Sequence, residues 1–161
     1  MLTFQELYDT YAADVYRFAL WLAGDTFRAE DITADTFVRA WTSSSPIRTE
    51  TLKAYLFTIA RNLHLEQHRK TRRQAALDEN HPDSHSRPDQ VVEAQLELEH
   101  VRKILLTLPE IDRTAFILRV QHDLPYAEIA RILGLTLSAT KVKVHRVRRK
   151  LLVARLGQEV T

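Results

Sequence analysis

The residues of this chain best suited to binding chemistry are cations near its C-terminal end. The segment from Lys141 to Arg155 contains seven Lys or Arg residues, and no Asp or Glu lies between Ser138 and Gln158. Cations at this density can meet the phosphates of a polyanion, and short or polar side chains at the start of a helix can reach base edges in a major groove. The segment therefore predicts a DNA-binding helix, and a basic helix face exposed to solvent is the alternative.

The residues before this segment fit a helix-turn-helix. In PYAEIARILGLTLSATKVKVHRVRRKLL, the small Ala130 stands four residues before Gly134, where a tight turn needs a positive φ angle. Thr136 can cap the second helix, and we expect Leu137 and Val144 to face the core. The expected contacts with duplex DNA are Thr136, Ser138, Ala139, Lys141, Val142, Lys143, His145, Arg146 and Arg149.

Other spacings in the chain do not support catalysis. His64 and His68 are four residues apart, but Glu66 does not directly follow the first His as the zinc-protease motif H-E-x-x-H requires, and a third ligand is missing. The chain has 0 Cys, no Gly-rich phosphate loop and no ordered Ser-His-Asp arrangement. The sequence predicts a protein that is not an enzyme and has no cofactor, metal site or small-molecule substrate.

Composition and periodicity predict an all-α chain. Of 161 residues 45% are hydrophobic, and only 3 are Gly and 5 are Pro. Amphipathic stripes predict helices over 4–22, 26–42, from 49 or 50 to 73, 91–106, around 115–120, 126–133 and 137–156. The N-terminus lacks the features of a signal peptide, and no apolar run approaches the ~20 residues of a membrane span. We expect a cytoplasmic protein that does not insert into a membrane.

Charge alternates in blocks along the chain. The net charge is −4 over residues 1–50, +5 over 51–73, −6 over 74–100 and +7 over 101–161. These blocks indicate two basic surfaces for a polyanion with an acidic stretch between them, unless they are only solvated faces. We predict two small helical domains, 1–73 and 91–161, joined by a flexible acidic linker over 74–90.

Three segments resemble the extracytoplasmic-function sigma factors of the sigma-70 family. AEDITADTFVRAW (29–41) resembles region 2.2, AYLFTIARNLHLEQHRKTRR (54–73) resembles regions 2.3 and 2.4, and 108–152 resembles region 4. The resemblance implies a sigma factor that directs promoter-specific transcription initiation. Region 2 would dock on the β′ clamp helices of RNA polymerase core and open promoter DNA at the −10 element, and region 4 would read the −35 element. The family also implies that an anti-sigma factor can hold such a chain inactive.

The resemblance assigns residues to these contacts. Asp31, Asp35 and Arg39 would dock on polymerase, although their spacing also fits an ion-pair ladder within one helix. The 43–50 loop and the third helix would meet the −10 element, with Asn62 hydrogen-bonding a base edge, unless Asn62 is only a solvated helix residue. The complete −10 set is Arg61, Asn62, His68, Arg69, Lys70, Arg72 and Arg73.

Two departures from the family lie on the predicted recognition helix. Ala139-Thr140 stands where the family usually has Thr-Val, and Lys143 stands where it usually has Arg. Thr140 brings a hydroxyl to a position that is usually apolar and half-buried, and Lys143 cannot make the bidentate contacts of an Arg.

A stand-alone helix-turn-helix regulator is the alternative function. Such a protein would bind operator DNA without polymerase, and it would explain residues 108–156 equally well. It would leave residues 1–73 to serve as a sensor or dimerisation domain.

Overall fold

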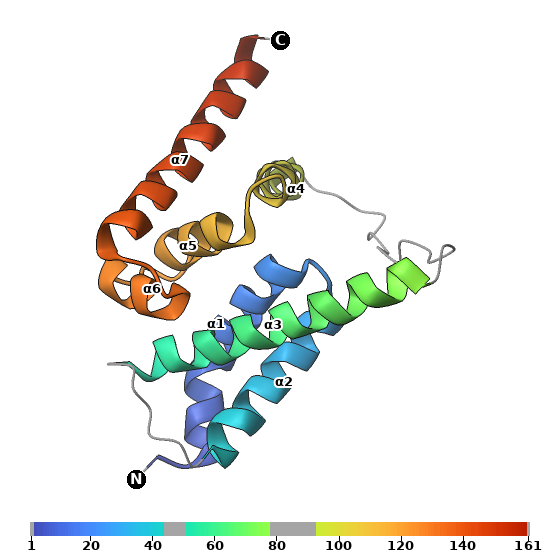
Figure 1. The fold of residues 1–161 in the computed structure, drawn as a ribbon, viewed down its shortest axis with the longest axis vertical. Helices are drawn as coiled ribbons and strands as arrows, with labels where there is room; N and C mark the ends of the chain where they lie inside the picture. The colour runs from blue at the N-terminus through green and yellow to red at the C-terminus, as the bar shows by residue number, and fades with distance from the viewer. Residues whose placement is uncertain (1, 44–50, 78–92, 161) are drawn as a thin grey trace. The chain divides into compact units, whose positions relative to one another are not determined.

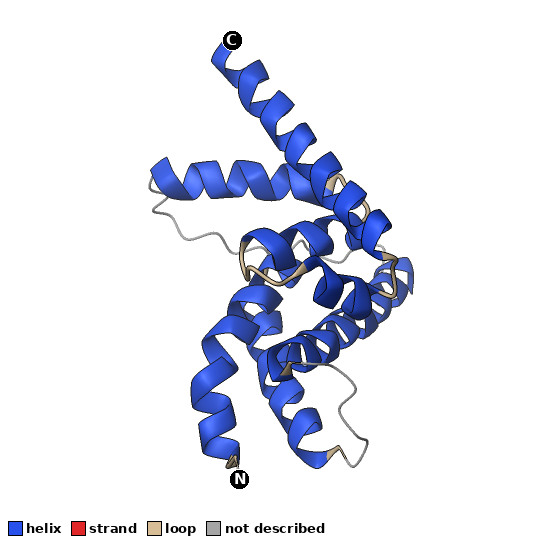
Figure 2. Ribbon diagram, turned by 90° about the vertical axis from the view of Figure 1, so that its left-hand side faces the viewer, coloured by secondary structure: helices blue, strands red, loops and turns tan. Residues whose placement is uncertain are grey.

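The computed structural model describes residues 2–43, 51–77 and 93–160, and the regular secondary structure in these ranges is entirely helical (Figures 1 and 2). The chain divides into two compact units, Met1–Arg87 and Pro88–Thr161. The predicted all-α fold class is therefore confirmed. The 44–50 part of the predicted −10 loop and the 78–90 part of the predicted linker lie outside the described residues.

Three helices make up the described part of unit 1: α1 (Phe4–Ala23), α2 (Thr26–Thr42) and α3 (Leu52–Leu77). Thr3 and Glu6 form a reciprocal capping box at the start of α1, with N–H···O distances of 2.9 and 3.1 Å. The helix ends at Gly24, whose φ of 75° is the left-handed conformation of a C-terminal cap. The side chain of Asp25 then accepts a hydrogen bond from the Phe27 N–H at 2.9 Å, so α2 begins at once.

The core of unit 1 is built on aromatic rings and small residues. The rings of Phe18 on α1 and Phe57 on α3 lie 4.8 Å apart between centroids, and both are fully buried. Ala29 and Ala60, which are also fully buried, bring little side-chain volume to the packed faces of α2 and α3. Trp41 was predicted near the apolar face, but it is 50% exposed and packs edge-on against Phe4.

Helix α3 is longer than its apolar pattern predicts. The apolar stripe ends at Leu65, and we expected the helix to end with the basic cluster at Arg73, but α3 continues to Leu77. Helix therefore covers the first four residues of the segment predicted as linker. Its last turns are exposed, and Gln, Ala and Leu are good helix formers that extend the helix without packing.

Four helices make up the described part of unit 2: α4 (Glu93–Leu106), α5 (Glu110–Val120), α6 (Tyr126–Leu133) and α7 (Leu137–Val160). Each lies near its predicted position, and α7 extends past the predicted end. The buried side chains of Leu118, Ile129 and Val144 bring α5, α6 and α7 into one core. No helix in the described ranges has both the length and the apolar composition needed to cross a bilayer.

The two units offer separate tests of their cores, because both Trp residues of the chain, Trp21 and Trp41, lie in unit 1. Phe57→Ala removes a fully buried ring, so we expect it to lower the free energy of unfolding of unit 1 by about 3–5 kcal/mol. Urea unfolding followed by Trp fluorescence measures this change.

Leu118→Ala is the matched control, because Leu118 is fully buried in unit 2. It should leave the urea midpoint of the Trp fluorescence transition unchanged. It should lower only the midpoint of a transition seen in the helical circular dichroism signal at 222 nm. A Trp transition that shifts equally in both variants would contradict two separately folded units.

Candidate nucleic-acid interface

The turn between α6 and α7 has the positive φ angle that its sequence predicts. Gly134 has a φ of 67°, and its N–H donates to the Ala130 carbonyl, as does the Leu135 N–H at 2.9 Å. Ile129, Ala130 and Leu133 are buried, as expected for the first helix of a helix-turn-helix. The two helices are therefore joined by a tight turn that a side chain with a Cβ would strain.

One row of α7 packs into unit 2. Thr140, Val144 and Val147 are at most 1% exposed and recur at spacings of four and three residues. The Thr140 hydroxyl, expected at a half-buried apolar position, is fully buried and donates to the Thr136 carbonyl at 2.8 Å, so its polarity is satisfied. The Thr136 hydroxyl accepts from the Ala139 N–H at 3.1 Å and confirms the predicted cap. The prediction that Leu137 faces the core was wrong, because Leu137 is 47% exposed.

The opposite side of α7 carries most of the predicted DNA contacts. Ser138, Val142, His145 and Arg149 are exposed and recur at spacings of four, three and four residues, so they share one side of the helix. Arg146 is exposed and lies beside this row, four residues after Val142 and three before Arg149. We call these five residues the outer row of α7. It combines short side chains near the helix start with guanidinium groups further along.

Lys143 differs from the other predicted contacts because it has a partner within unit 2. Its Nζ lies 2.8 Å from the Asp112 Oδ1 on α5, and the two side chains are only 23% and 13% exposed. The pair joins α7 to α5. An ammonium bonded to this carboxylate is not presented to solvent as the outer row is.

The start of α5 also carries a guanidinium, that of Arg113, which burial perturbs. Arg113 donates to the Leu108 carbonyl at 3.2 Å. Burial lowers the pKa of its guanidinium, and the nearby Glu110 carboxylate acts in the opposite direction. The α5 segment that holds Lys143 is thus itself fixed by a backbone carbonyl.

Sequence reasoning missed two residues beside the predicted contacts. The guanidinium of Arg119 lies 4.5 Å from the ring centroid of Tyr126, and the ammonium of Lys141 lies 5.9 Å from the same ring. Arg119 also donates to the Leu124 carbonyl at 3.1 Å. These contacts hold one cation of α5 and one of α7 at the first residue of α6. No spacing rule predicts such a cluster, because its members lie on three helices.

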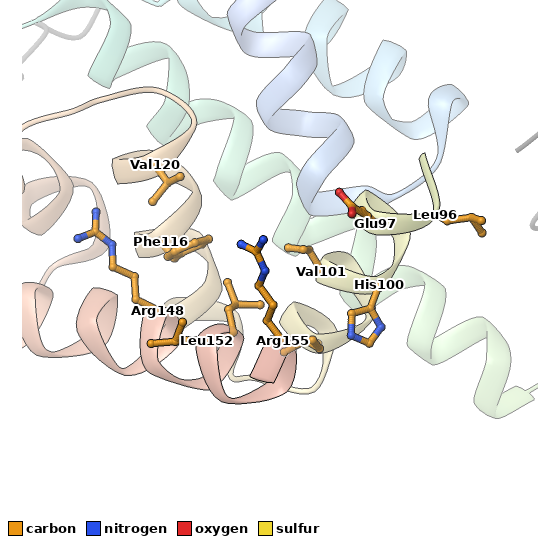
Figure 3. Close-up of a pocket in the computed structure, with 11 residues that line it drawn as sticks. Leu96, Glu97, His100, Val101, Phe116, Val120, Arg148, Leu152 and Arg155 are labelled. Atoms are coloured by element: carbon orange, nitrogen blue, oxygen red, sulfur yellow. The ribbon is translucent and has the colours of Figure 1, made fainter. Parts of the chain in front are cut away.

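Not all α7 cations lie in the outer row. A groove of about 750 Å³ lies between α4, α5 and α7, and Arg148 and Arg155 line it together with apolar side chains such as Val101, Phe116 and Leu152 (Figure 3). Arg148 and Arg155 are seven residues apart and so share a side of the helix. The later arginines, expected to meet phosphates together, therefore divide between two sides of α7.

The predicted −10 residues form two rows along α3. Asn62, Arg69 and Arg73 recur at seven and four residues, and so do Arg61, His68 and Arg72. One residue turns the helix by roughly 100°, so the two rows face different directions. All of these residues are exposed except the half-buried Arg61, and Lys70 is exposed outside both rows.

His64 is buried with its ring stacked 6.0 Å from that of His68, and no cluster of three potential metal ligands occurs in the described ranges.

The predicted polymerase contacts lie on the solvent side of α2. Asp31 and Asp35 are exposed and four residues apart. The ion-pair ladder that was the alternative for these residues is absent from the described α2. Instead, Nη2 of Arg39 lies 3.4 Å from the Glu66 Oε2 on α3. Sequence reasoning did not connect these two residues because they lie 27 positions apart.

Comparisons with known proteins match both units. Residues 7–74 match the family model for Sigma-70 region 2, and residues 98–151 match the model for Sigma-70, region 4. The chain is 31% identical over 144 residues to the ECF RNA polymerase sigma factor SigL of Mycobacterium tuberculosis, over 86% of this chain and 81% of SigL. It is 29% identical over 152 residues to the ECF RNA polymerase sigma factor SigM of Bacillus subtilis, over 93% of each chain.

A solved structure is similar over nearly the same length. It contains the sigma factor RpoE in complex with the anti-sigma factor NepR from Bartonella quintana. The TM-score is 0.78 at 29% sequence identity, and the match covers 92% of this chain and 93% of that one.

We expect the ion pair of Lys143 and Asp112 to stabilise unit 2, and we expect no such contribution from the exposed cations of α7. Lys143→Ala would leave the largely buried Asp112 carboxylate without its partner, at a cost of about 1–3 kcal/mol in the free energy of unfolding of unit 2. Arg146→Ala, on an exposed side chain, should change it by less than about 0.5 kcal/mol. Urea unfolding of both variants, followed by circular dichroism, compares them. Equal stability of the two variants would show that the pair contributes nothing.

Proposed function

The chain belongs to the extracytoplasmic-function RNA polymerase sigma factors of the sigma-70 family, and from this premise we propose how its two units share transcription initiation. As a sigma factor it directs polymerase to promoters. In our proposal residues 1–73 dock on polymerase core and open the −10 element, and residues 91–161 read the −35 element, with 74–90 joining them.

The observation that carries this division is the presence of two exposed basic surfaces in two matched regions of one chain. The outer row of α7 lies in the region 4 match, and both basic rows of α3 lie within the region 2 match at residues 7–74. A stand-alone regulator would account for the first surface only. The second surface favours the sigma-factor mechanism over that alternative.

For region 4, we propose that α7 enters the major groove of the −35 duplex. Ser138, Val142 and Arg146 would reach base edges, with the Val142 methyl groups suited to a thymine methyl. Arg149 and Lys141 would meet phosphates, and Thr136, Ala139 and His145 would border the groove. Lys143, bonded to Asp112, would hold α7 in place and contribute little to base reading.

For region 2, we propose that the two rows of α3 serve different parts of the −10 element. Asn62 is exposed and carries both a donor and an acceptor for a base edge, and Arg69 and Arg73 on the same side would hold the backbone. The row of Arg61, His68 and Arg72, with Lys70, would meet the neighbouring strand once DNA is opened.

For polymerase binding, we propose that α2 contacts the β′ clamp helices through Asp31 and Asp35. Both carboxylates are exposed, and neither has an ion-pair partner in the described part of unit 1. Unpaired surface carboxylates suit a basic partner, and they speed its association. Arg39, also expected there, would stand at the edge of this surface because Glu66 engages its guanidinium.

We also propose that this chain binds an anti-sigma factor, as its structural relative does. Its role would be binding rather than catalysis, with bond formation left to polymerase. It would act in the cytoplasm, where polymerase meets the chromosome.

Charge reversal on α2 and truncation on α7 should weaken two different interactions, the first with polymerase core and the second with −35 DNA. Asp31→Lys with Asp35→Lys should lower the affinity for polymerase core at least about tenfold, because it places like charges across the interface. Arg146→Ala should weaken binding to −35 duplex by about 1–3 kcal/mol and spare core binding. Titration of labelled core and promoter binding by the holoenzyme measure the two affinities.

Glu30→Lys with Ala34→Lys is the control for charge, since these residues are also exposed on α2. It should cost less core affinity than the Asp pair. Unchanged core affinity in the Asp31 and Asp35 variant would contradict the docking surface, and loss of core binding by Arg146→Ala would contradict the role of region 4.

A further inference from the structure

Glu66 is the one acidic residue in the sequence of α3, a helix with six Lys or Arg residues. It lies on the same side as Asn62, Arg69 and Arg73, because these four positions recur at spacings of four, three and four residues. Its side chain is 46% exposed. A carboxylate therefore stands within the row of α3 that we propose faces DNA.

Stability does not explain this carboxylate. Its ion pair with Arg39 spans 3.4 Å between side chains that are 53% and 46% exposed, and exposed pairs of this kind contribute little to folding. Phosphates would also be repelled by an acid in this row. A carboxylate that faces DNA is favourable only where it meets a hydrogen-bond donor, and bases present such donors as exocyclic amino groups.

The contact with Arg39 occupies one oxygen of the Glu66 carboxylate and leaves the other available as an acceptor. Nη2 of Arg39 donates to Oε2, and no hydrogen bond within the described ranges uses Oε1. Arg39 thus neutralises the charge and restrains the side chain from α2, while one oxygen remains to accept. Guanine and thymine present acceptors in the major groove and would be repelled. Adenine presents an acceptor beside its amino group, whereas cytosine presents the amino donor alone.

We propose that Glu66 reads a cytosine amino group in the major groove of the −10 region while that base pair is still closed, and that Arg39 is the residue that positions Glu66. This inference rests on the proposed contact of α3 with the −10 element and adds the base that one position of that element should carry. It also gives Arg39 a role toward DNA through Glu66.

The test is transcription by holoenzyme, with full-length chain and polymerase core, over a promoter library randomised across the −10 region. The native chain should prefer cytosine over guanine by at least about fivefold at one position. Glu66→Gln should move the preference at that position to adenine, because a Gln amide pairs with the adenine amino group and N7. Arg39→Ala should lower the cytosine preference there, and Arg39→Lys should restore part of it.

Glu30→Gln is the matched control, since it removes the same charge from an exposed site on α2 and should change no base preference. Trp fluorescence unfolding checks that each variant is folded. If Glu66→Gln raises use of all promoters equally, Glu66 only repels phosphates and the inference is wrong. Unchanged preferences at every position would overturn it too. Failure of the native chain to initiate with core would instead overturn the proposed function.

Discussion

Burial of one row of α7 determines which of its cations face solvent. Thr140, Val144 and Val147 pack into unit 2, and the helix period then places Val142 and Arg149 on the opposite side. The positive φ of Gly134 sets the turn that lets α6 and α7 pack in this way. The charge density of the segment alone does not select a face. Packing selects it and leaves Arg148 and Arg155 beside the groove of α4 and α5.

Local sequence signals account for the part of the fold that the sequence predicts. The seven helices, the turn at Gly134 and the cap at Thr136 follow from local signals: apolar periodicity, a glycine and a hydroxyl at the right spacing. The extension of α3 to Leu77 was missed because it rests on helix propensity after the apolar stripe has ended. Leu137 was placed in the core by its type alone, although the buried row of α7 begins only at Thr140.

The sequence did not predict the contacts between helices at the candidate site. Lys143 was expected to bind DNA with its neighbours, and its carboxylate partner lies 31 residues away on α5. Arg39 was expected to dock on polymerase, with an ion pair in its own helix as the alternative, and its partner lies 27 residues away on α3. Residue types and spacing identify which side chains can bind an anion. They do not identify which cations the fold has already paired, and that pairing separates positioning residues from those open to DNA.

In our proposal the two basic surfaces work together once polymerase holds the chain. A gel-shift titration of promoter DNA, with and without polymerase core and at several salt concentrations, tests it most directly. The account predicts weak, salt-sensitive binding by the chain alone and specific promoter binding when core is added. Tight specific binding without core, or no association with core, would contradict it.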